Sequence, residues 1–249
     1  MATIYCFTST GNSLYAAKII AEKIGGKVAP MKGSATCGDN VIGFVLPVYF
    51  WGLPRIAARF IKNINIKNKE AYIFAVATFG RAAPGVLGLV NQLLKPKGVS
   101  LQYGGNLKML DNYIPVSQVK DSEKTRQGID KIIEQIAEAV ARREKNRIQA
   151  SSMMNQVMYQ SYPDESSDLF FTVSYSCTGC AVCRDICPVK NISIKKGEPV
   201  FKHRCEHCLA CLHNCPEAAL DWGQKTKGRE RYRNAGITLD ELLSFNKGG

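Results

Sequence analysis

The stretch Cys177-Thr-Gly-Cys180-Ala-Val-Cys183-Arg-Asp-Ile-Cys187-Pro188 carries four cysteines at the spacing C-x2-C-x2-C-x3-C, followed by a proline. The pattern returns in Cys205-Glu-His-Cys208-Leu-Ala-Cys211-Leu-His-Asn-Cys215-Pro216, so the cysteines and the proline recur at an offset of 28 residues. Apolar flanking residues align at the same offset in three pairs: Val173 with Phe201, Ile192 with Leu220, and Ile194 with Trp222. The repeat predicts two halves, each made of a strand, a cysteine loop and a strand, related by a pseudo-twofold axis.

The concentration of thiols in these two loops indicates metal ligation. Eight of the ten cysteines lie between Cys177 and Cys215, and the N-terminus lacks the basic start of a secretion signal. In such a chain a dense group of cysteines is more typical of metal sites than of disulfides. Two zinc sites are the alternative, although zinc motifs usually pair two C-x2-C halves across a longer loop. The three histidines, His203, His207 and His213, are expected to be surface residues near these loops.

The spacing resembles that of bacterial two-cluster ferredoxins. This resemblance implies a small α+β domain with two 4Fe-4S clusters, in which the fourth cysteine of each run crosses to the other cluster. It implies that cluster 1 is held by Cys177, Cys180, Cys183 and Cys215, and cluster 2 by Cys205, Cys208, Cys211 and Cys187. A segment of about 55 residues buries too little apolar surface to be stable alone, so metal ligation is expected to supply the missing free energy.

Near the N-terminus, an apolar strand leads into a turn rich in hydroxyl groups. Residues 3–7 are β-branched, aromatic and apolar, as in a buried strand. The turn Thr8-Ser9-Thr10-Gly11-Asn12-Ser13 follows, and then a helix that should end near Ile24. Backbone N–H groups and hydroxyls at a helix N-terminus bind anions, and no Lys or Arg precedes Lys18. The turn therefore suits a terminal phosphate held by neutral donors, with an ordinary helix cap as the alternative.

Strands and helices alternate through the rest of the first 148 residues. Apolar runs at 41–46 and 71–77 predict strands buried on both faces of a parallel sheet, and a further strand is expected at 100–109. Helices are expected at 54–64, 85–95 and 122–147, and the last has an inward stripe of Ile129, Ile133, Ile136 and Val140. This alternation predicts an α/β doubly wound parallel sheet, with ligands bound at the carboxyl ends of its strands.

Aromatic side chains follow two of these strands. The loops are Pro47-Val-Tyr49-Phe50-Trp51-Gly52 and Thr78-Phe79-Gly80-Arg81. Flat rings beside a phosphate turn are what a flavin ring needs on its faces. Asp111-Asn112-Tyr113 follows the last expected strand and is a weaker candidate at the same edge.

The turn at residues 8–13 resembles the T/S-x-T-G-x-T phosphate loop of flavodoxins, with Ser13 for the final Thr. This resemblance implies the strand order 2-1-3-4-5, bound FMN, and loops 47–52 and 78–81 beside the isoalloxazine ring. It leaves open which aromatic residue stacks on the flavin, and Arg81 is expected to raise the flavin potential as a nearby cation.

The whole chain resembles the flavodoxin–ferredoxin fusion proteins of anaerobic bacteria and archaea. This implies an FMN-binding domain at 1–148, a linker at 149–169, a two-cluster domain at 170–224 and a basic tail with a short helix at 225–249. In the linker, residues 164–168 are expected to be solvated. A helical stripe of apolar residues is expected to pack between the domains: Met153, Met154, Val157 and Met158.

The net charge is +12, with 33 Lys+Arg against 21 Asp+Glu, a balance that can indicate nucleic-acid binding. The excess falls on residues 1–150, which carry +11, and is spread along them without a nucleic-acid motif. Ordinary flavodoxins are acidic whereas this region is basic, so their usual partners are not carried over. We expect the basic region to attract an acidic redox partner protein, and we expect no nucleic acid. No apolar run reaches the roughly 18 residues of a membrane span, and oxygen-labile clusters favour the cytoplasm of an anaerobe.

These features predict an electron-transfer flavo-iron–sulfur protein that joins one-electron clusters to FMN, which can hold two electrons. The alternative is a flavin-dependent reductase of a small molecule, fed by the clusters. In that case Tyr113 or Asp111 would serve as the proton donor.

Overall fold

The computed structural model describes residues 1–82, 84–120 and 123–247. The chain divides into two compact units. The first, here called the sheet unit, comprises Met1–Thr8, Asn12–Leu110 and Asp121–Tyr162. The second, here called the cysteine unit, comprises Ser9–Gly11, Asp111–Lys120 and Pro163–Gly249.

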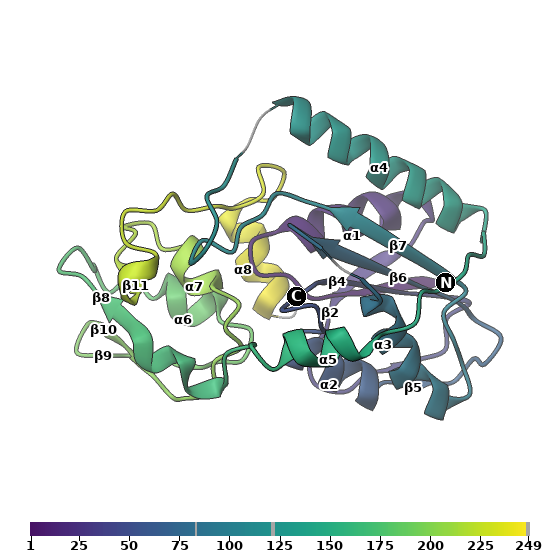
Figure 1. Ribbon diagram of the computed structural model, residues 1–249, viewed down its shortest axis with the longest axis horizontal. Helices are drawn as coiled ribbons and strands as arrows, with labels where there is room; N and C mark the ends of the chain where they lie inside the picture. The colour runs from purple at the N-terminus through teal and green to yellow at the C-terminus, as the bar shows by residue number, and fades with distance from the viewer. Residues whose placement is uncertain (83, 121–122, 248–249) are drawn as a thin grey trace. The chain divides into compact units, whose positions relative to one another are not determined.

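The sheet unit is built on five parallel strands (Figure 1). Across the sheet they run in the order β2 (Lys27–Pro30), β1 (Ala2–Cys6), β4 (Val41–Pro47), β6 (Tyr72–Phe79) and β7 (Tyr103–Lys108). Counted along the chain, this is the predicted order 2-1-3-4-5 of a flavodoxin-like fold. The central strands are continuous apolar runs because both of their faces are covered, and Phe44 and Phe74 are fully buried.

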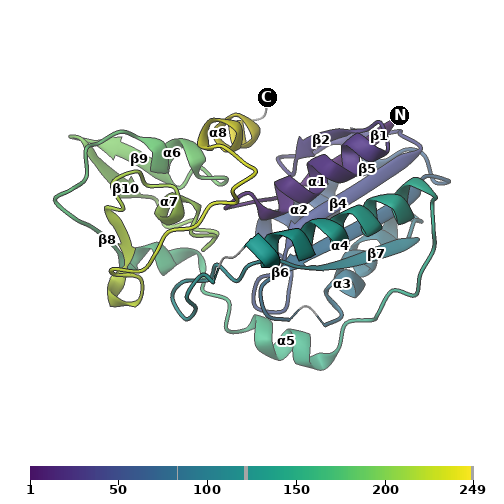
Figure 2. The ribbon, with the colours of Figure 1, turned by 90° about the horizontal axis from the view of Figure 1, so that it is seen from above.

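Two pairs of helices cover the sheet, as the alternation predicted. Helices α1 (Asn12–Lys23) and α4 (Glu123–Ala141) lie on one face, and α2 (Arg55–Asn63) and α3 (Val86–Leu94) lie on the other (Figure 2). The expected extension of the last helix to residue 147 is wrong, since α4 ends at Ala141. Arg143 has a φ of 53°, a left-handed conformation that cannot continue an α-helix. The expected start at residue 122 lies outside the described residues.

The sheet unit ends with α5 (Met153–Tyr159), inside the expected linker. We expected the apolar residues of this helix to pack between the domains. That prediction is wrong, because Met153, Met154 and Val157 are 79%, 53% and 52% exposed. The buried residue of this helix is Asn155, at 2% exposure. Because the buried residue of α5 is polar, hydrophobic periodicity in the sequence does not identify the inner face of this helix.

The cysteine unit consists of short elements in two similar halves. The first half contains β8 (Phe171–Val173), α6 (Val182–Ile186) and β9 (Ile192–Lys195). The second contains β10 (Glu198–Phe201), α7 (Ala210–His213) and β11 (Leu220–Trp222). The predicted strand–loop–strand pattern of each half is confirmed. β11 pairs with β8 and β10 with β9, both antiparallel.

Small elements complete the two units. In the sheet unit, β3 (Thr36–Cys37) pairs with β5 (Asn65–Ile66). In the cysteine unit, α8 (Leu239–Lys247) begins after Thr238, whose hydroxyl accepts a hydrogen bond from the Glu241 backbone at 3.1 Å. No helix in the described part of the chain is long and apolar enough to cross a membrane.

Candidate functional site

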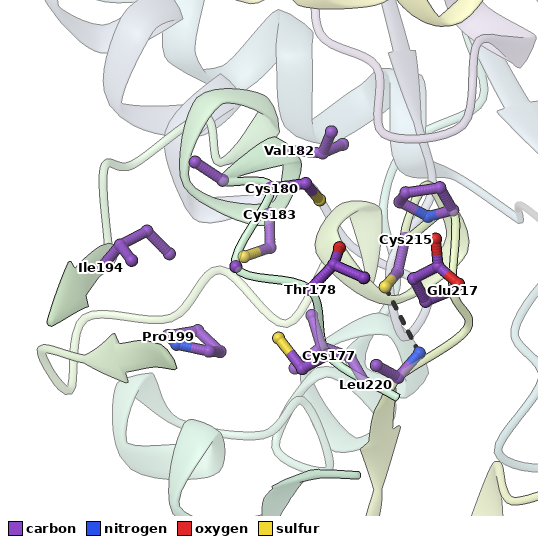
Figure 3. Close-up of a pocket in the computed structure, with 14 residues that line it drawn as sticks. Cys177, Thr178, Cys180, Val182, Cys183, Ile194, Pro199, Cys215, Glu217 and Leu220 are labelled. Carbon is purple, nitrogen blue, oxygen red and sulfur yellow. Dashed lines mark hydrogen bonds between the residues drawn. The ribbon is translucent and has the colours of Figure 1, made fainter. Parts of the chain in front are cut away.

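The first set of cysteines surrounds one pocket of the cysteine unit. Cys177, Cys180, Cys183 and Cys215 all line it, although Cys215 comes from the other half of the repeat (Figure 3). Apolar residues complete the wall, among them Ile194, Pro199 and Leu220. Burial, together with the charges of Cys215, Cys180 and Cys177, raises the pKa of Cys183 to about 11. Four thiols gathered this closely repel one another as thiolates, and iron cations would relieve that repulsion.

The second set gathers in the same way and also draws one member from the other half. Burial raises the pKa of Cys208 well above its usual value, with Cys187 and Cys205 adding to the effect. For Cys211, burial comes first, followed by the charges of Cys205, Cys208 and Cys187. Each set therefore holds three thiols from one run and the fourth from the other. No group of three or more His, Cys, Asp or Glu side chains in the described residues converges at the spacing of a single metal ion.

The cysteine loops repeat in backbone conformation as well as in sequence. Positive φ angles occur in pairs at the repeat offset: Gly179 and His207, Ala181 and Leu209, and Lys190 and Ala218. Such residues turn the chain sharply, so each loop curls around its own three cysteines. This conformation is costly for residues with a Cβ, and its recurrence indicates that both loops are shaped for the same purpose.

Backbone N–H groups donate to the crossing sulfurs in both halves. Asn191 N lies 3.2 Å from Cys187 Sγ, and Ala219 N lies 3.3 Å from Cys215 Sγ. These two bonds are related by the repeat. Hydrogen bonds to the sulfurs stabilise their negative charge and are one determinant of an iron–sulfur cluster's potential.

Two of the three histidines are buried, so the expectation that all three lie on the surface is wrong for them. His207 and His213 are 3% and 5% exposed. His213 Nε2 donates to Asn112 O at 3.0 Å, and His213 Nδ1 accepts from Tyr232 N at 3.1 Å. Burial lowers the pKa of His213 to about 4, so its ring is neutral at pH 7. It joins two segments of the cysteine unit.

Asp168 is also buried, and its expected place in a solvated linker is wrong. It is 2% exposed and accepts hydrogen bonds from Asn191 Nδ2 at 2.7 Å and from His203 N at 2.9 Å. His203 Nδ1 lies 2.7 Å from its other oxygen. The carboxylate thus holds His203, two residues before Cys205, in place. Nothing in the polar run 164–168 of the sequence indicates this role.

In the sheet unit, three loops meet at the carboxyl edge of the sheet. They follow β1, β4 and β6, which are neighbours in the sheet. Pro47 pairs with Thr78 at the ends of β4 and β6, and Ser13 Oγ lies 2.8 Å from Thr78 Oγ1. The arrangement brings Ser13, Pro47 and Thr78, one residue from each predicted loop, close together.

The turn between β1 and α1 keeps its polar side chains close to the protein. Thr8, Ser9, Thr10, Asn12 and Ser13 are each less than 9% exposed. Gly11 has a φ of 95°, which L-residues rarely adopt, and a Cβ there would lie 3.0 Å from Ile237 Cβ. A turn of hydroxyls and backbone N–H groups at the start of a twelve-residue helix fits a phosphate group with neutral donors.

The middle of this turn belongs to the cysteine unit, together with the segment after β7. Asn112 Nδ2 donates to Thr10 Oγ1 at 2.6 Å, and Asn234 N donates to Thr10 O at 2.8 Å. Asp111 accepts from Ser117 Oγ at 2.6 Å. Tyr113 Oη lies 3.1 Å from His207 Nε2, and burial raises the pKa of Tyr113 to about 12. Asp111 and Tyr113 thus have structural partners within the cysteine unit.

The three aromatic rings of the loop after β4 have different surroundings. Tyr49 contacts Tyr162 edge-on, with ring centroids 5.8 Å apart, and Phe50 stacks on Tyr162 at 5.3 Å and 17°. Among the described residues, no ring pairs with that of Trp51, which is only partly buried. In the neighbouring loop, Phe79 and Gly80 are partly buried and Arg81 is exposed.

Comparisons with known proteins address both units. A family model described as a 4Fe-4S dicluster domain matches residues 141–220. A comparison with curated proteins finds none that matches this chain.

The solved structures that are similar to part of the chain include the following three. Rubredoxin oxygen:oxidoreductase from Desulfovibrio gigas is 13% identical over 57% of this chain and 36% of its own, with a TM-score of 0.37. The flavodoxin of Streptococcus pneumoniae is 13% identical over 55% of this chain and 97% of its own, at 0.37. The flavodoxin of Megasphaera elsdenii is 14% identical over 43% of this chain and 85% of its own, at 0.31.

The chain thus spans about a third of the Desulfovibrio protein it resembles. The fold assignment rests on strand order and not on these likenesses. The chain joins a flavodoxin-like fold to a region that matches the model of a 4Fe-4S dicluster domain, a combination consistent with a flavodoxin–ferredoxin fusion protein.

Proposed function

We propose that this chain is an electron-transfer protein that binds two 4Fe-4S clusters and one FMN and passes electrons between them and redox partner proteins. The observation that carries the proposal is the gathering of eight cysteines into two sets of four, each completed by a cysteine from the other half of the repeat. A 4Fe-4S cluster needs four thiolates. Because each run of cysteines contributes ligands to both clusters, the two clusters are held close together.

The ligand assignment follows the two sets. Cluster 1 takes Cys177, Cys180, Cys183 and Cys215, and cluster 2 takes Cys187, Cys205, Cys208 and Cys211. The protein supplies thiolates and N–H donors to the crossing sulfurs. These groups set how readily each cluster accepts an electron.

The FMN site is assigned to the carboxyl edge of the sheet. The turn of residues 8–13 would hold the phosphate through backbone N–H groups and hydroxyls. Loops 47–52 and 78–81 would flank the ring system, with Trp51 the ring that we assign to stacking, because Tyr49 and Phe50 already contact Tyr162. Bound FMN would supply one- and two-electron chemistry, while these residues position the ring and limit its contact with water.

The partner is assigned by charge. Residues 1–150 carry +11, so an acidic redox protein would be attracted to this part of the chain. Oxygen-labile clusters and free thiols fit the cytoplasm of an anaerobic cell.

The test is an assay of iron, acid-labile sulfide and flavin in anaerobically purified protein. The proposal expects about eight irons, about eight sulfides and one FMN per chain. Zinc in place of iron, or no flavin at all, would disprove it. A small molecule whose reduction saturates and depends on Tyr113 would instead indicate the reductase alternative.

A further inference from the structure

The turn that carries Phe50 and Trp51 has a backbone conformation that these residues disfavour. Their φ angles are 49° and 60°, both left-handed. Tyr49 and Gly52 close the turn with paired backbone hydrogen bonds of 3.1 and 2.8 Å. Two successive left-handed residues inside a two-residue hairpin form a type I′ turn, a position usually taken by Asn-Gly. Two aromatic residues there need support from the surrounding structure.

That support comes from α5, and its centre is Asn155. The Asn155 side chain is 2% exposed, and its Nδ2 donates to Trp51 O and to Pro84 O, both at 2.7 Å. Its Oδ1 accepts from Ser152 N at 2.9 Å. A buried amide destabilises a fold unless it is hydrogen-bonded, and here both N–H groups and the oxygen are used. One side chain thereby ties the loop after β4 to the segment that follows the loop after β6.

Three further residues, Tyr159, Tyr162 and Arg55, complete the contact. Tyr159 Oη donates to Leu53 O at 2.7 Å, and a Cβ at Gly52 would clash with the Tyr159 ring. Tyr162 stacks on Phe50, and the Arg55 guanidinium lies 4.1 Å from the centre of the Tyr162 ring. The residues of α5 and Tyr162 therefore contact the turn through its backbone and through two of its rings, those of Tyr49 and Phe50.

We propose that α5 and Tyr162 form a clamp that fixes the aromatic turn for flavin binding, and that Asn155 is its positioning residue. The inference rests on the proposed FMN site. Asn155 acts on the flavin through the Trp51 carbonyl, which it holds directly. The clamp fixes the direction of the Trp51 ring and the spacing of the two loops at the carboxyl edge of the sheet.

The test compares Asn155→Asp, Asn155→Ala and the matched control Gln156→Ala in the full-length protein with its clusters intact. Asn155→Asp keeps the size and the acceptor of the side chain but removes both N–H donors. Gln156 is an exposed amide on the same helix. FMN is titrated into flavin-free protein, and the potential and absorption spectrum of bound FMN are then measured at saturation.

Both Asn155 variants should raise the FMN dissociation constant at least about tenfold, since each loses two buried hydrogen bonds that order the site. The potential and the spectrum of FMN should shift even at saturation, which a change in global stability alone would not cause. Amide exchange at Gly52 should also become faster in flavin-free protein. Gln156→Ala should behave as wild type in all three measurements.

Wild-type FMN affinity, potential and Gly52 exchange in both Asn155 variants would overturn the clamp. Wild-type protein that binds no FMN would overturn the proposed function, and the exchange rate at Gly52 would then still decide whether Asn155 holds the turn. If circular dichroism shows that Asn155→Ala is unfolded, Tyr159→Phe takes the place of that variant in each measurement. Tyr159→Phe removes one hydrogen bond to the same segment.

Discussion

The two units of this protein are stabilised in different ways. The sheet unit has strands of up to eight residues and fully buried side chains such as Phe44, Phe74 and Ile4. The cysteine unit has strands of three or four residues, and its two cysteine-loop helices have five and four residues. We expect the first unit to fold around apolar contacts, and the second to draw much of its stability from the proposed cluster ligation. A cofactor site can therefore be an addition to a fold or a condition for it.

The largest expected effect tests this difference directly. Cys208→Ala should remove one cluster, about four irons per chain, and unfold much of the cysteine unit while the sheet unit stays folded. Iron analysis and calorimetry would show the loss. Cys6→Ala is the control, because Cys6 is buried in β1 and belongs to neither set. Full iron content in Cys208→Ala would contradict the ligand assignment.

The reverse experiment acts on the apolar core. Phe74 is fully buried in β6, so Phe74→Ala should reduce the free energy of unfolding of the sheet unit by about 3–5 kcal/mol. The clusters should remain, because their ligands lie in the other unit. Chemical denaturation is followed by the fluorescence of Trp51 in a Trp222→Phe background, because Trp222 lies in the cysteine unit, and the visible absorption of the clusters is recorded in parallel to separate the two transitions. Simultaneous loss of both signals would show that the units do not differ in this way.

A smaller effect is expected at the phosphate turn. Gly11→Ala places a Cβ against Ile237 at a φ of 95°, and we expect about 1–3 kcal/mol of strain and weaker FMN binding. Isothermal titration with FMN measures the affinity. The control is Gly128→Ala in α4, where a Cβ meets no atom within 4 Å and helix propensity should give a slight gain in stability. Equal FMN affinity in the two variants would argue against a phosphate site at this turn.

The smallest effect concerns the tuning of the flavin. Arg81 is exposed at the end of the loop after β6, and its cation should stabilise reduced, anionic flavin. Arg81→Ala should therefore lower the FMN midpoint potential, by an amount that corresponds to less than about 1 kcal/mol, as is usual for exposed charges. Lys67→Ala, another exposed cation near the amino ends of the strands, should leave the potential unchanged. An unchanged potential in Arg81→Ala would remove Arg81 from the flavin site.

The parts of this fold that follow a short-range pattern could be predicted from the sequence. The buried central strands follow from continuous apolar runs at 41–46 and 71–77, and the two cysteine loops follow from their spacing, whereas the strand order was implied only by the resemblance to flavodoxins. The errors lie where a polar residue is buried by distant partners. Asp168, His213 and Asn155 each find hydrogen-bond partners far along the chain, and no periodicity marks such residues.

By itself, the amino-acid sequence determined that this protein has eight thiols in a duplicated metal-binding pattern and an alternating strand–helix region with a hydroxyl-rich turn. Those features are local, because spacing and hydrophobic periodicity act over a few residues. Only the tertiary structure decided which cysteines share a pocket, that α5 holds the aromatic turn through Asn155, and that Gly11 packs against Ile237. These contacts join residues more than 20 positions apart, and their free energy appears only once the chain has folded.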